Sequence, residues 1–255
     1  LLCLGENFYT EKPGDLNDLN LHKLQLKLAN KLSKCGKPII LVLNIGRPRL
    51  ISEIEPFMSA VLNIYLPGNM GADALVDIVS GKVNPSGKLP YTYPAFPNSL
   101  STYYYKPSEV QNNSQGAYNY VGELNNLYEF GYGLSYSTFE YGVPSISDTL
   151  MNSEESLVVK IVVTNTSNVD GEEVIQWYIH DHFANAARPI KELKYFEKEL
   201  IKAGETRTFM FEISEETLKY YDHNEDYVAE PGSFSVMVGP NSSELQTIHF
   251  HLDAE

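Results

Sequence analysis

The sequence predicts a parallel α/β domain followed by an all-β sandwich. Strand-like and helix-like segments alternate over residues 1–80, whereas strand-like segments separated by turn signals fill residues 143–255. Charge changes along the chain in the same way. Residues 1–142 carry 11 Lys/Arg against 12 Asp/Glu, and residues 143–255 carry 8 against 21. The change in composition near residue 142 predicts a domain boundary there.

The α/β prediction begins with a short apolar run, Leu1–Leu4, which ends at Gly5 and reads as a strand. Residues 21–35 then predict a helix, because leucines recur at helical spacing. We expect Asn20 to cap the start of this helix and Gly36 to follow its end. The leucines of the expected apolar stripe are Leu21, Leu24, Leu28 and Leu32.

Two further strands and a helix complete this part. Ile39–Leu43 is a run of five apolar residues, which is typical of a strand buried on both faces of a parallel sheet. Residues 60–66 repeat the pattern, and residues 71–80 predict a short helix closed by Gly81. Ligands of such sheets bind outside the carboxyl ends of the strands. The loop "GENFYTEKPGDLNDLNL" and the segments "NIGRPR" and "PGNMG" are expected at that edge.

The second half of the chain is predicted to be all-β. Residues 83–142 are rich in Pro, Gly and aromatics, and a long segment of this kind usually wraps a surface or bridges domains. Six strand-like runs follow, separated by turns such as "SNVDG" and "EPGS". Their number and spacing favour a sandwich of immunoglobulin or fibronectin type without a disulfide.

Composition excludes several classes of function. A net charge of −14 argues against a nucleic-acid partner, and no apolar run approaches the ~18 residues of a membrane span. Cys3 and Cys35 do not make a disulfide framework; we expect Cys3 to be a buried strand residue and Cys35 to end a helix. The chain has no signal peptide and begins within a strand without a Met, as expected of part of a longer protein.

Several catalytic or ligand-binding motifs are absent or weak. "GLSYS" lacks the second glycine of a nucleophile elbow, and no Walker loop or GxGxxG occurs. "PGNMGAD" (67–73) could place an anion at a helix start, but a tight strand-to-helix turn is the better interpretation. In "HDH", alternation puts His180 and His182 on one face of a strand, yet no third metal ligand stands out. We therefore predict no metal and no cofactor.

Two carboxylates in the first loop are the best candidates for catalysis. Glu6 and Glu11 follow the end of a strand, at the edge where parallel sheets bind ligands. Phe8 and Tyr9 lie between them and could desolvate a carboxyl group. Desolvation raises the pKa of a carboxyl, as a general acid at neutral pH requires.

The chain resembles the C-terminal part of a glycoside hydrolase family 3 enzyme, the β-glucosidase group. Nearly the whole chain takes part in the resemblance, through five motifs in order. They are "GENFYTEKPGD" (5–15), "GKPIILVLNIGRPR" (36–49), "LPGNMGADALVDIVSGKVNPSGKLPYTYP" (66–94), "LYEFGYGLSYSTFEY" (127–141), and "RPIKELKYFEKELIKAGETRTFMFEI" followed by "PGSFSVMVG".

The resemblance implies domain limits and a reaction. It implies an incomplete flavodoxin-like α/β sandwich domain over 1–94 and a fibronectin type III-like domain over 143–255. We expect the linking segment over 95–142 to pack on both domains, because its many aromatic residues would otherwise be exposed. Members hydrolyse β-linked sugars with retention, using an Asp nucleophile from an N-terminal (β/α)8 barrel and an acid/base Glu from the α/β domain. The present chain lacks the barrel, so we expect it to be inactive alone. The expected partners are a β-linked oligosaccharide or glycoside and the barrel half of the same enzyme, in the periplasm or outside the cell.

The family that the chain resembles has more than one loop pattern, and the patterns assign the acid/base role to different glutamates. In the pattern "GE-x-x-Y-x-E-x-x-GD" the second glutamate has this role, and Glu11 matches it in full register. In a shorter pattern the Glu directly after Gly takes the role, which would be Glu6. The full match favours Glu11, with Glu6 holding the loop. Two alternatives stay open: a non-catalytic fragment, or a ligand-binding α/β module with a structural sandwich.

Overall fold

A computed structural model describes residues 1–9, 11–97, 99, 102–107 and 126–254. The chain divides into two compact units. The α/β unit comprises residues 1–83 with the described parts of 93–100 and 125–128, and the sandwich unit comprises 84–92, the described part of 101–124, and 129 onward. The domain limits given above stay a prediction, and residues 108–125 of the linking segment lie outside the described residues.

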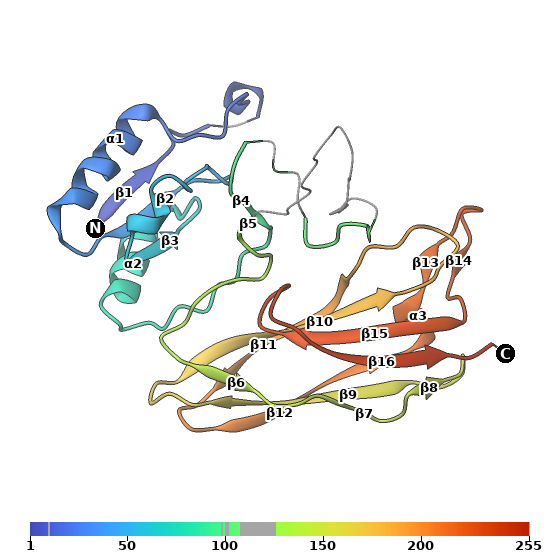
Figure 1. The fold of residues 1–255 in the computed structure, drawn as a ribbon. Helices are drawn as coiled ribbons and strands as arrows, with labels where there is room; N and C mark the ends of the chain where they lie inside the picture. The colour runs from blue at the N-terminus through green and yellow to red at the C-terminus, as the bar shows by residue number, and fades with distance from the viewer. Residues whose placement is uncertain (10, 98, 100–101, 108–125, 255) are drawn as a thin grey trace, which may run out of the picture. The chain divides into compact units, whose positions relative to one another are not determined.

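The α/β unit is built on three parallel strands in the order β1-β2-β3, coloured blue to cyan in Figure 1. In the central strand, Leu41, Val42 and Leu43 are at most 1% exposed, as the unbroken apolar run predicts. A short antiparallel pair, β4-β5, belongs to the same unit. The elements of this unit are β1 (Leu2–Gly5), η1 (Lys12–Gly14), α1 (Lys23–Leu32), η2 (Ser33–Cys35), β2 (Ile40–Asn44), η3 (Glu55–Phe57), β3 (Ala60–Asn63), η4 (Gly68–Met70), α2 (Gly71–Val79), β4 (Tyr93–Pro94) and β5 (Asn126–Tyr128).

Helix α1 differs from its prediction at its start and on its surface. His22, not Asn20, is the N-cap: its ring accepts a hydrogen bond from the Leu24 amide at 3.3 Å. Asn20 lies too far upstream because its backbone pairs with Leu50 in a parallel bridge. Leu24 and Leu28 are exposed. The expected apolar stripe is therefore only partly the buried face of the helix.

The prediction that Cys3 is buried is wrong. In β1 the side chains of Leu2 and Leu4 take the buried face, so the alternation of a strand places Cys3 on the other side, where it is exposed. Cys35 ends η2 and is also exposed, and both thiols are free.

The sandwich unit stacks two sheets, with strand orders β11-β10-β15-β16-β8 and β12-β9-β6, β7 also pairing with β9 (Figure 1). All six predicted strand-like runs form strands, and the sheets are antiparallel except for the β16-β8 pair. The elements of this unit are β6 (Phe139–Tyr141), β7 (Ser145–Ile146), β8 (Leu150–Met151), β9 (Leu157–Asn165), β10 (Gly171–Asp181), β11 (Glu192–Ile201), β12 (Thr206–Ile213), α3 (Glu215–Leu218), β13 (Tyr220–Tyr221), β14 (Tyr227–Val228), β15 (Gly232–Gly239) and β16 (Gln246–Leu252).

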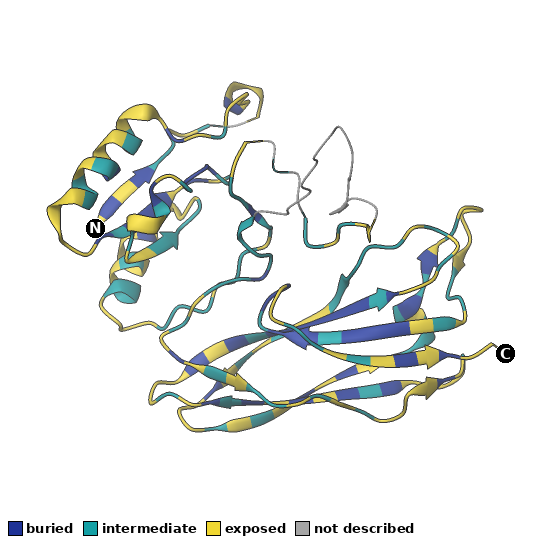
Figure 2. Cartoon of the chain, viewed as in Figure 1, coloured by how far each residue is buried: buried dark blue, intermediate teal, exposed yellow. Residues whose placement is uncertain are grey.

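One apolar cluster fills the space between these two sheets. Buried and exposed residues alternate along β9 and β12, which Figure 2 shows as changing colours along the strands. At its centre Trp177 is fully buried and lies 5.7 Å from Phe211, centroid to centroid. The alternation along each strand thus supplies the core of the sandwich.

Residues 84–92 are bound to the sandwich by polar contacts. Lys88 donates to Gly133 O at 2.9 Å and pairs with Glu173 at 3.3 Å, and the Tyr141 hydroxyl also donates to Glu173 at 2.9 Å. Glu173 is only 2% exposed, and its burial raises the pKa of this carboxyl while Lys88 opposes the rise. The side-chain amide of Asn84 also donates a hydrogen bond to Ser137 Oγ.

No helix in the described part of the chain is long and apolar enough to cross a membrane.

Candidate active-site loop

The loop that carries the two candidate carboxylates leaves the carboxyl end of β1. There the Glu6 amide donates to Asn44 O at 3.2 Å, which joins it to the end of β2. The ends of β1 and β2 lie close together, because a Cβ added to Gly5 would lie 2.3 Å from Asn44 O. Because β1 and β2 are parallel, the segment "NIGRPR" after β2 emerges beside the first loop, at the predicted edge.

Glu6 is held by two arginines from that neighbouring segment. Arg47 Nε lies 3.2 Å from Glu6 Oε1 and 3.5 Å from Oε2, and Arg49 Nη1 lies 3.4 Å from Oε1. The side chains of Glu6 and Arg49 are 11% and 10% exposed. Ion pairs removed from water in this way hold their geometry better than surface pairs. These ion pairs join the Glu6 carboxylate to the segment after β2 and so fix the start of the loop.

Arg47 contacts two other points of the same loop. Its guanidinium carbon lies 3.8 Å from the centroid of the Tyr9 ring, and its Nη1 donates to Gly14 O at 2.5 Å. The Tyr9 ring lies between two glycines. A Cβ on Gly14 would come within 2.7 Å of Tyr9 Cδ2, and a Cβ on Gly46 within 2.5 Å of its hydroxyl. Both positions thus need glycine for the ring to lie there.

Glu11 occupies a different environment on the same loop. It is exposed, and its carboxyl forms no hydrogen bond or ion pair with any residue that the structure describes. Its backbone has φ 48° and ψ −140°, which is sparsely populated by residues with a Cβ. The following 3-10 turn η1 is closed by the Gly14 amide, which donates to Glu11 O at 2.8 Å. A strained residue of this kind persists where its surroundings fix it, often at functional sites.

The aromatic residues of the loop do not cover the Glu11 carboxyl. Phe8 is fully exposed, and Tyr9 packs on Arg47 beside Glu6. The expectation that these rings desolvate a carboxyl group is therefore not met at Glu11, which stays exposed in this chain.

Arg49 fixes the later part of the loop. Its guanidinium donates to Asp18 O at 3.3 Å and to Asn20 O. Its own carbonyl accepts a hydrogen bond from the Tyr93 hydroxyl at 2.6 Å. Burial raises the pKa of Tyr93, so this hydroxyl remains a donor at any ordinary pH.

Sequence reasoning placed Glu6 and Glu11 in the loop but gave Arg47 and Arg49 no role. The signal that could have found them is their position after the next parallel strand, since that segment meets the first loop at the same edge of the sheet. The segment "NIGRPR" carries two arginines two residues apart and is expected at the same edge as Glu6 and Glu11.

The histidines of "HDH" lie on the outer face of the sandwich. His180 and His182 have ring centroids 4.3 Å apart, as strand alternation predicts. Ser235 lies on the neighbouring strand, and its Oγ is 2.7 Å from His182 Nε2 and 2.8 Å from His249 Nδ1. Burial and the neighbouring His182 lower the pKa of His180, and burial and His249 lower the pKa of His182.

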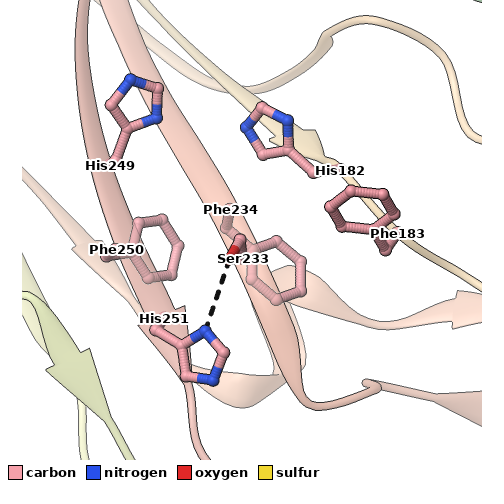
Figure 3. A pocket seen from close by; sticks show the side chains of 7 residues that line it. All are labelled: His182, Phe183, Ser233, Phe234, His249, Phe250 and His251. Atoms are coloured by element: carbon pink, nitrogen blue, oxygen red, sulfur yellow. Dashed lines mark hydrogen bonds between the residues drawn. The ribbon is translucent and has the colours of Figure 1, made fainter.

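A shallow hollow of about 440 Å³ lies over these strands (Figure 3). In it Ser233 approaches His251 Nδ1 at 3.5 Å. Within the described residues, no three His, Cys, Asp or Glu side chains are gathered in a way that could hold a metal ion. The residues lining the hollow are His182, Phe183, Ser233, Phe234, His249, Phe250 and His251.

The fold thus defines a class: a parallel α/β domain with a carboxyl-bearing loop at its strand ends, joined to a fibronectin type III-like sandwich. The family model of the glycosyl hydrolase family 3 C-terminal domain matches residues 1–136, and that of the fibronectin type III-like domain matches residues 173–242. The chain belongs to glycoside hydrolase family 3, of which it forms a C-terminal part.

Individual relatives agree with this membership. The chain is 35% identical to a β-xylosidase of Formosa agariphila, over 97% of this chain and 35% of that protein. It is 35% identical to a periplasmic β-glucosidase of Salmonella typhimurium, over 92% of this chain and 32% of that protein. The crystal structure of a β-glucosidase from Listeria innocua in complex with glucose superposes with a TM-score of 0.92 at 34% identity, covering 99% of this chain and 36% of that one. The chain spans about a third of the length of the relatives it matches.

Proposed function

We propose that this chain is the C-terminal part of a retaining β-glycosidase and supplies its acid/base residue, Glu11. The enzyme would hydrolyse terminal β-linked sugars of the gluco or xylo type. Support for this substrate class comes from the relatives, which are named β-glucosidases and β-xylosidases. The nucleophile would be an Asp of an N-terminal (β/α)8 barrel that is not part of this chain.

The contrast between the two loop carboxylates is the observation that carries the assignment. A residue that protonates a leaving group must reach the substrate, whereas Glu6 is enclosed by Arg47 and Arg49. Glu11 is exposed and unengaged among the described residues. Its turn is nevertheless ordered by the contacts of Tyr9 and Gly14. Glu11 thus combines a free carboxyl group with a fixed position.

The reaction would then proceed in two steps, with Glu11 in two roles. The barrel Asp attacks the anomeric carbon while the protonated Glu11 donates its proton to the departing oxygen, and a covalent glycosyl-enzyme forms. Glu11, now a carboxylate, removes a proton from water, which attacks the anomeric carbon and releases the Asp. The two carboxyl groups of a retaining enzyme lie ~5–5.5 Å apart. Because the nucleophile would come from the barrel, Glu6 and Glu11 would not form this pair themselves. Burial by sugar and barrel would supply the desolvation that Phe8 and Tyr9 do not.

The proposal includes two partners and a location. The partners are the glycoside substrate and the barrel half of the same enzyme. A periplasmic or secreted location goes with it, supported by the name of the Salmonella relative.

The test uses the complete enzyme, with this chain joined to its barrel. Glu11→Ala should lower turnover of a disaccharide by roughly 10²–10⁴-fold, because a poor leaving group needs the proton. An activated aryl glycoside should still form its glycosyl-enzyme, and azide should restore its turnover, since a small anion attacks without a base. Glu6→Ala should lower activity without rescue by azide.

Glu225→Ala is the matched control. Glu225 is also an exposed glutamate at positive φ, 69°, but it lies in the sandwich unit. Its substitution should leave the turnover of both substrates unchanged. Rescue of Glu6→Ala and not of Glu11→Ala would reverse the assignment. Full activity of Glu11→Ala on the disaccharide would refute the proposal and favour a non-catalytic role for the loop.

A further inference from the structure

We propose that Arg47 is the positioning residue of the Glu11 turn, and that it acts on catalysis only through Glu11. This inference rests on the proposed function. It adds a role for a side chain of the segment after β2, which neither the family model nor the relatives' names assign.

The contacts of Arg47 lie on both sides of Glu11. Its guanidinium stacks on Tyr9, two residues before Glu11, and donates to Gly14 O, three residues after it. It also binds Glu6, at the start of the loop. A single rigid group thereby fixes three points of the loop around one exposed carboxyl group.

Only arginine can make these contacts together. The guanidinium is planar, so its edge donates to the Glu6 carboxylate and the Gly14 carbonyl while its face stays on the Tyr9 ring. A lysine ammonium keeps the charge, but it is a compact group without a flat face and without the in-plane fork. Lys at this position should therefore keep one contact and lose the combination.

The backbone of Glu11 makes this support necessary. Its φ of 48° and ψ of −140° are unfavourable for a residue with a Cβ, so the turn relaxes when its flanks are released. A displacement of ~1 Å at a catalytic group can lower the rate 10²-fold. Release of Tyr9 and Gly14 should therefore move the carboxyl group away from the leaving oxygen.

Arg49 differs from Arg47 in a way that sharpens the inference. It shares Glu6, but its other contacts are with Asp18 O and Asn20 O, beyond the turn. Arg49 thus fixes the exit of the loop, and of the two arginines it is Arg47 that contacts both flanks of Glu11.

The experiment is a double-mutant cycle in the complete enzyme, with Arg47→Lys and Glu11→Ala made singly and together. On a disaccharide, Arg47→Lys alone should lower kcat about 10²-fold with little change in KM. In the Glu11→Ala background the same substitution should change kcat by less than about 3-fold, because the residue through which it acts is gone. Guanidinium ion should partly restore kcat of Arg47→Ala, and should not do so when Glu11 is also replaced.

Arg207→Lys is the matched control. Arg207 also pairs with a carboxylate, Glu199 at 3.0 Å, donates to Leu200 O at 2.9 Å, and lies over a ring, Phe209 at 5.5 Å, but in the sandwich unit. Its substitution should leave kcat unchanged. Tyr9→Leu, which removes the stacked ring alone, serves if the Arg47 variants do not fold, and it should show the same dependence on Glu11 with a smaller loss.

The possible failures are distinguishable. If Arg47→Lys lowers kcat equally in both backgrounds, Arg47 does not act through Glu11, and the inference is wrong while the proposed function stands. If kcat of Arg47→Lys alone is unchanged, the inference is also wrong. If Glu11→Ala alone has no effect on the disaccharide, the proposed function itself fails.

Discussion

The loop of the α/β unit and the core of the sandwich unit are stabilised by different kinds of contact. Among the described residues from Glu6 to Asp15, only Gly14 is buried. The conformation of the loop therefore depends on two arginines, one carboxylate and one aromatic ring. In the sandwich, one cluster of buried apolar side chains fills the space between two sheets. The loop therefore depends on a few directional contacts, and the sandwich depends on packed area.

This difference indicates where activity and stability can be changed separately. Directional contacts of the loop are few, so breaking one moves a functional group without unfolding much apolar surface. Packed contacts of the sandwich are many, so their loss destabilises the fold and leaves the loop chemistry intact. Substitutions in the two regions should thus divide into those that lower kcat and those that lower the free energy of unfolding.

The largest expected effect comes from separating the chain from its barrel. On the proposed function, the isolated chain should give no turnover of an aryl β-glucoside above background, because the second carboxyl group of the pair would belong to the barrel. Mixing it with a separately made barrel half should restore turnover that depends on Glu11. Turnover by the pure chain that disappears when one of its own residues is replaced would contradict this.

The next largest effect is expected at the buried ion pair of Lys88 and Glu173 in the sandwich unit. Lys88→Met leaves the buried Glu173 carboxylate without its cation, which should cost about 3–5 kcal/mol of unfolding free energy at neutral pH. The pKa of Glu173 is already raised by burial and would rise further without Lys88. The folded state then binds its proton more readily than the unfolded state, so the deficit should shrink as the pH falls.

Denaturant unfolding of the isolated chain at several pH values measures this effect. The double variant Lys88→Met/Glu173→Gln buries no charge and should recover much of the loss at neutral pH. A deficit of Lys88→Met that grows on acidification would show that the sign of the argument is wrong.

Packing in the sandwich core should give a comparable but pH-independent loss. Ile161 is 1% exposed within the core cluster, and Ile161→Ala should lower the free energy of unfolding by about 2–5 kcal/mol. Val162, the next residue of β9, is 40% exposed, and Val162→Ala should change it far less. In the complete enzyme, folded Ile161→Ala should retain the kcat of the parent. A loss of kcat larger than the loss of folded protein would contradict the expectation that core substitutions lower stability and not activity.

The fold could be predicted further than the site because its signals are local. The apolar run before Asn44 predicts a buried strand, and the strand-like run at 155–166 predicts a strand; both are confirmed. The exposure of Leu24 and Leu28 could not be read from the sequence, since helical spacing shows that a stripe exists and not which surface covers it. The same ambiguity applies to Cys3, since a short apolar run shows that a strand is buried and not which of its two faces is covered.

The site was only half predictable, again for a physical reason. Glu6 and Glu11 could be found because they follow a strand within one loop. Their difference depends on Arg47 and Arg49, which lie about 40 residues further along the chain and reach Glu6 only because β1 and β2 are adjacent and parallel. Such pairing depends on three-dimensional register, which no local pattern in the sequence contains.

The smallest expected effect is a pH dependence of the stability of the sandwich unit. His180 and His182 have lowered pKa values because they are partly buried and lie beside each other and His249. In the unfolded chain these imidazoles titrate near ~6.5. As the pH falls through this value the unfolded state binds protons first, so the free energy of unfolding should fall and then level off once the folded imidazoles are also charged.

Other titrating groups near these strands must be separated from this effect. His251 Nε2 lies 3.9 Å from Asp253 Oδ1 at the end of β16, and burial raises the pKa of Asp181 to about 6. Asp181 acts in the opposite direction, because its raised pKa stabilises the fold as the pH falls through about 6. The difference between parent and a His180→Asn/His182→Asn variant cancels the contributions that both share. This difference should favour the parent at pH 8 relative to pH 5, whereas His22→Asn, in the α/β unit, should leave the pH profile of the sandwich unchanged. Identical profiles of parent and double variant would show that the two imidazoles are not coupled to folding.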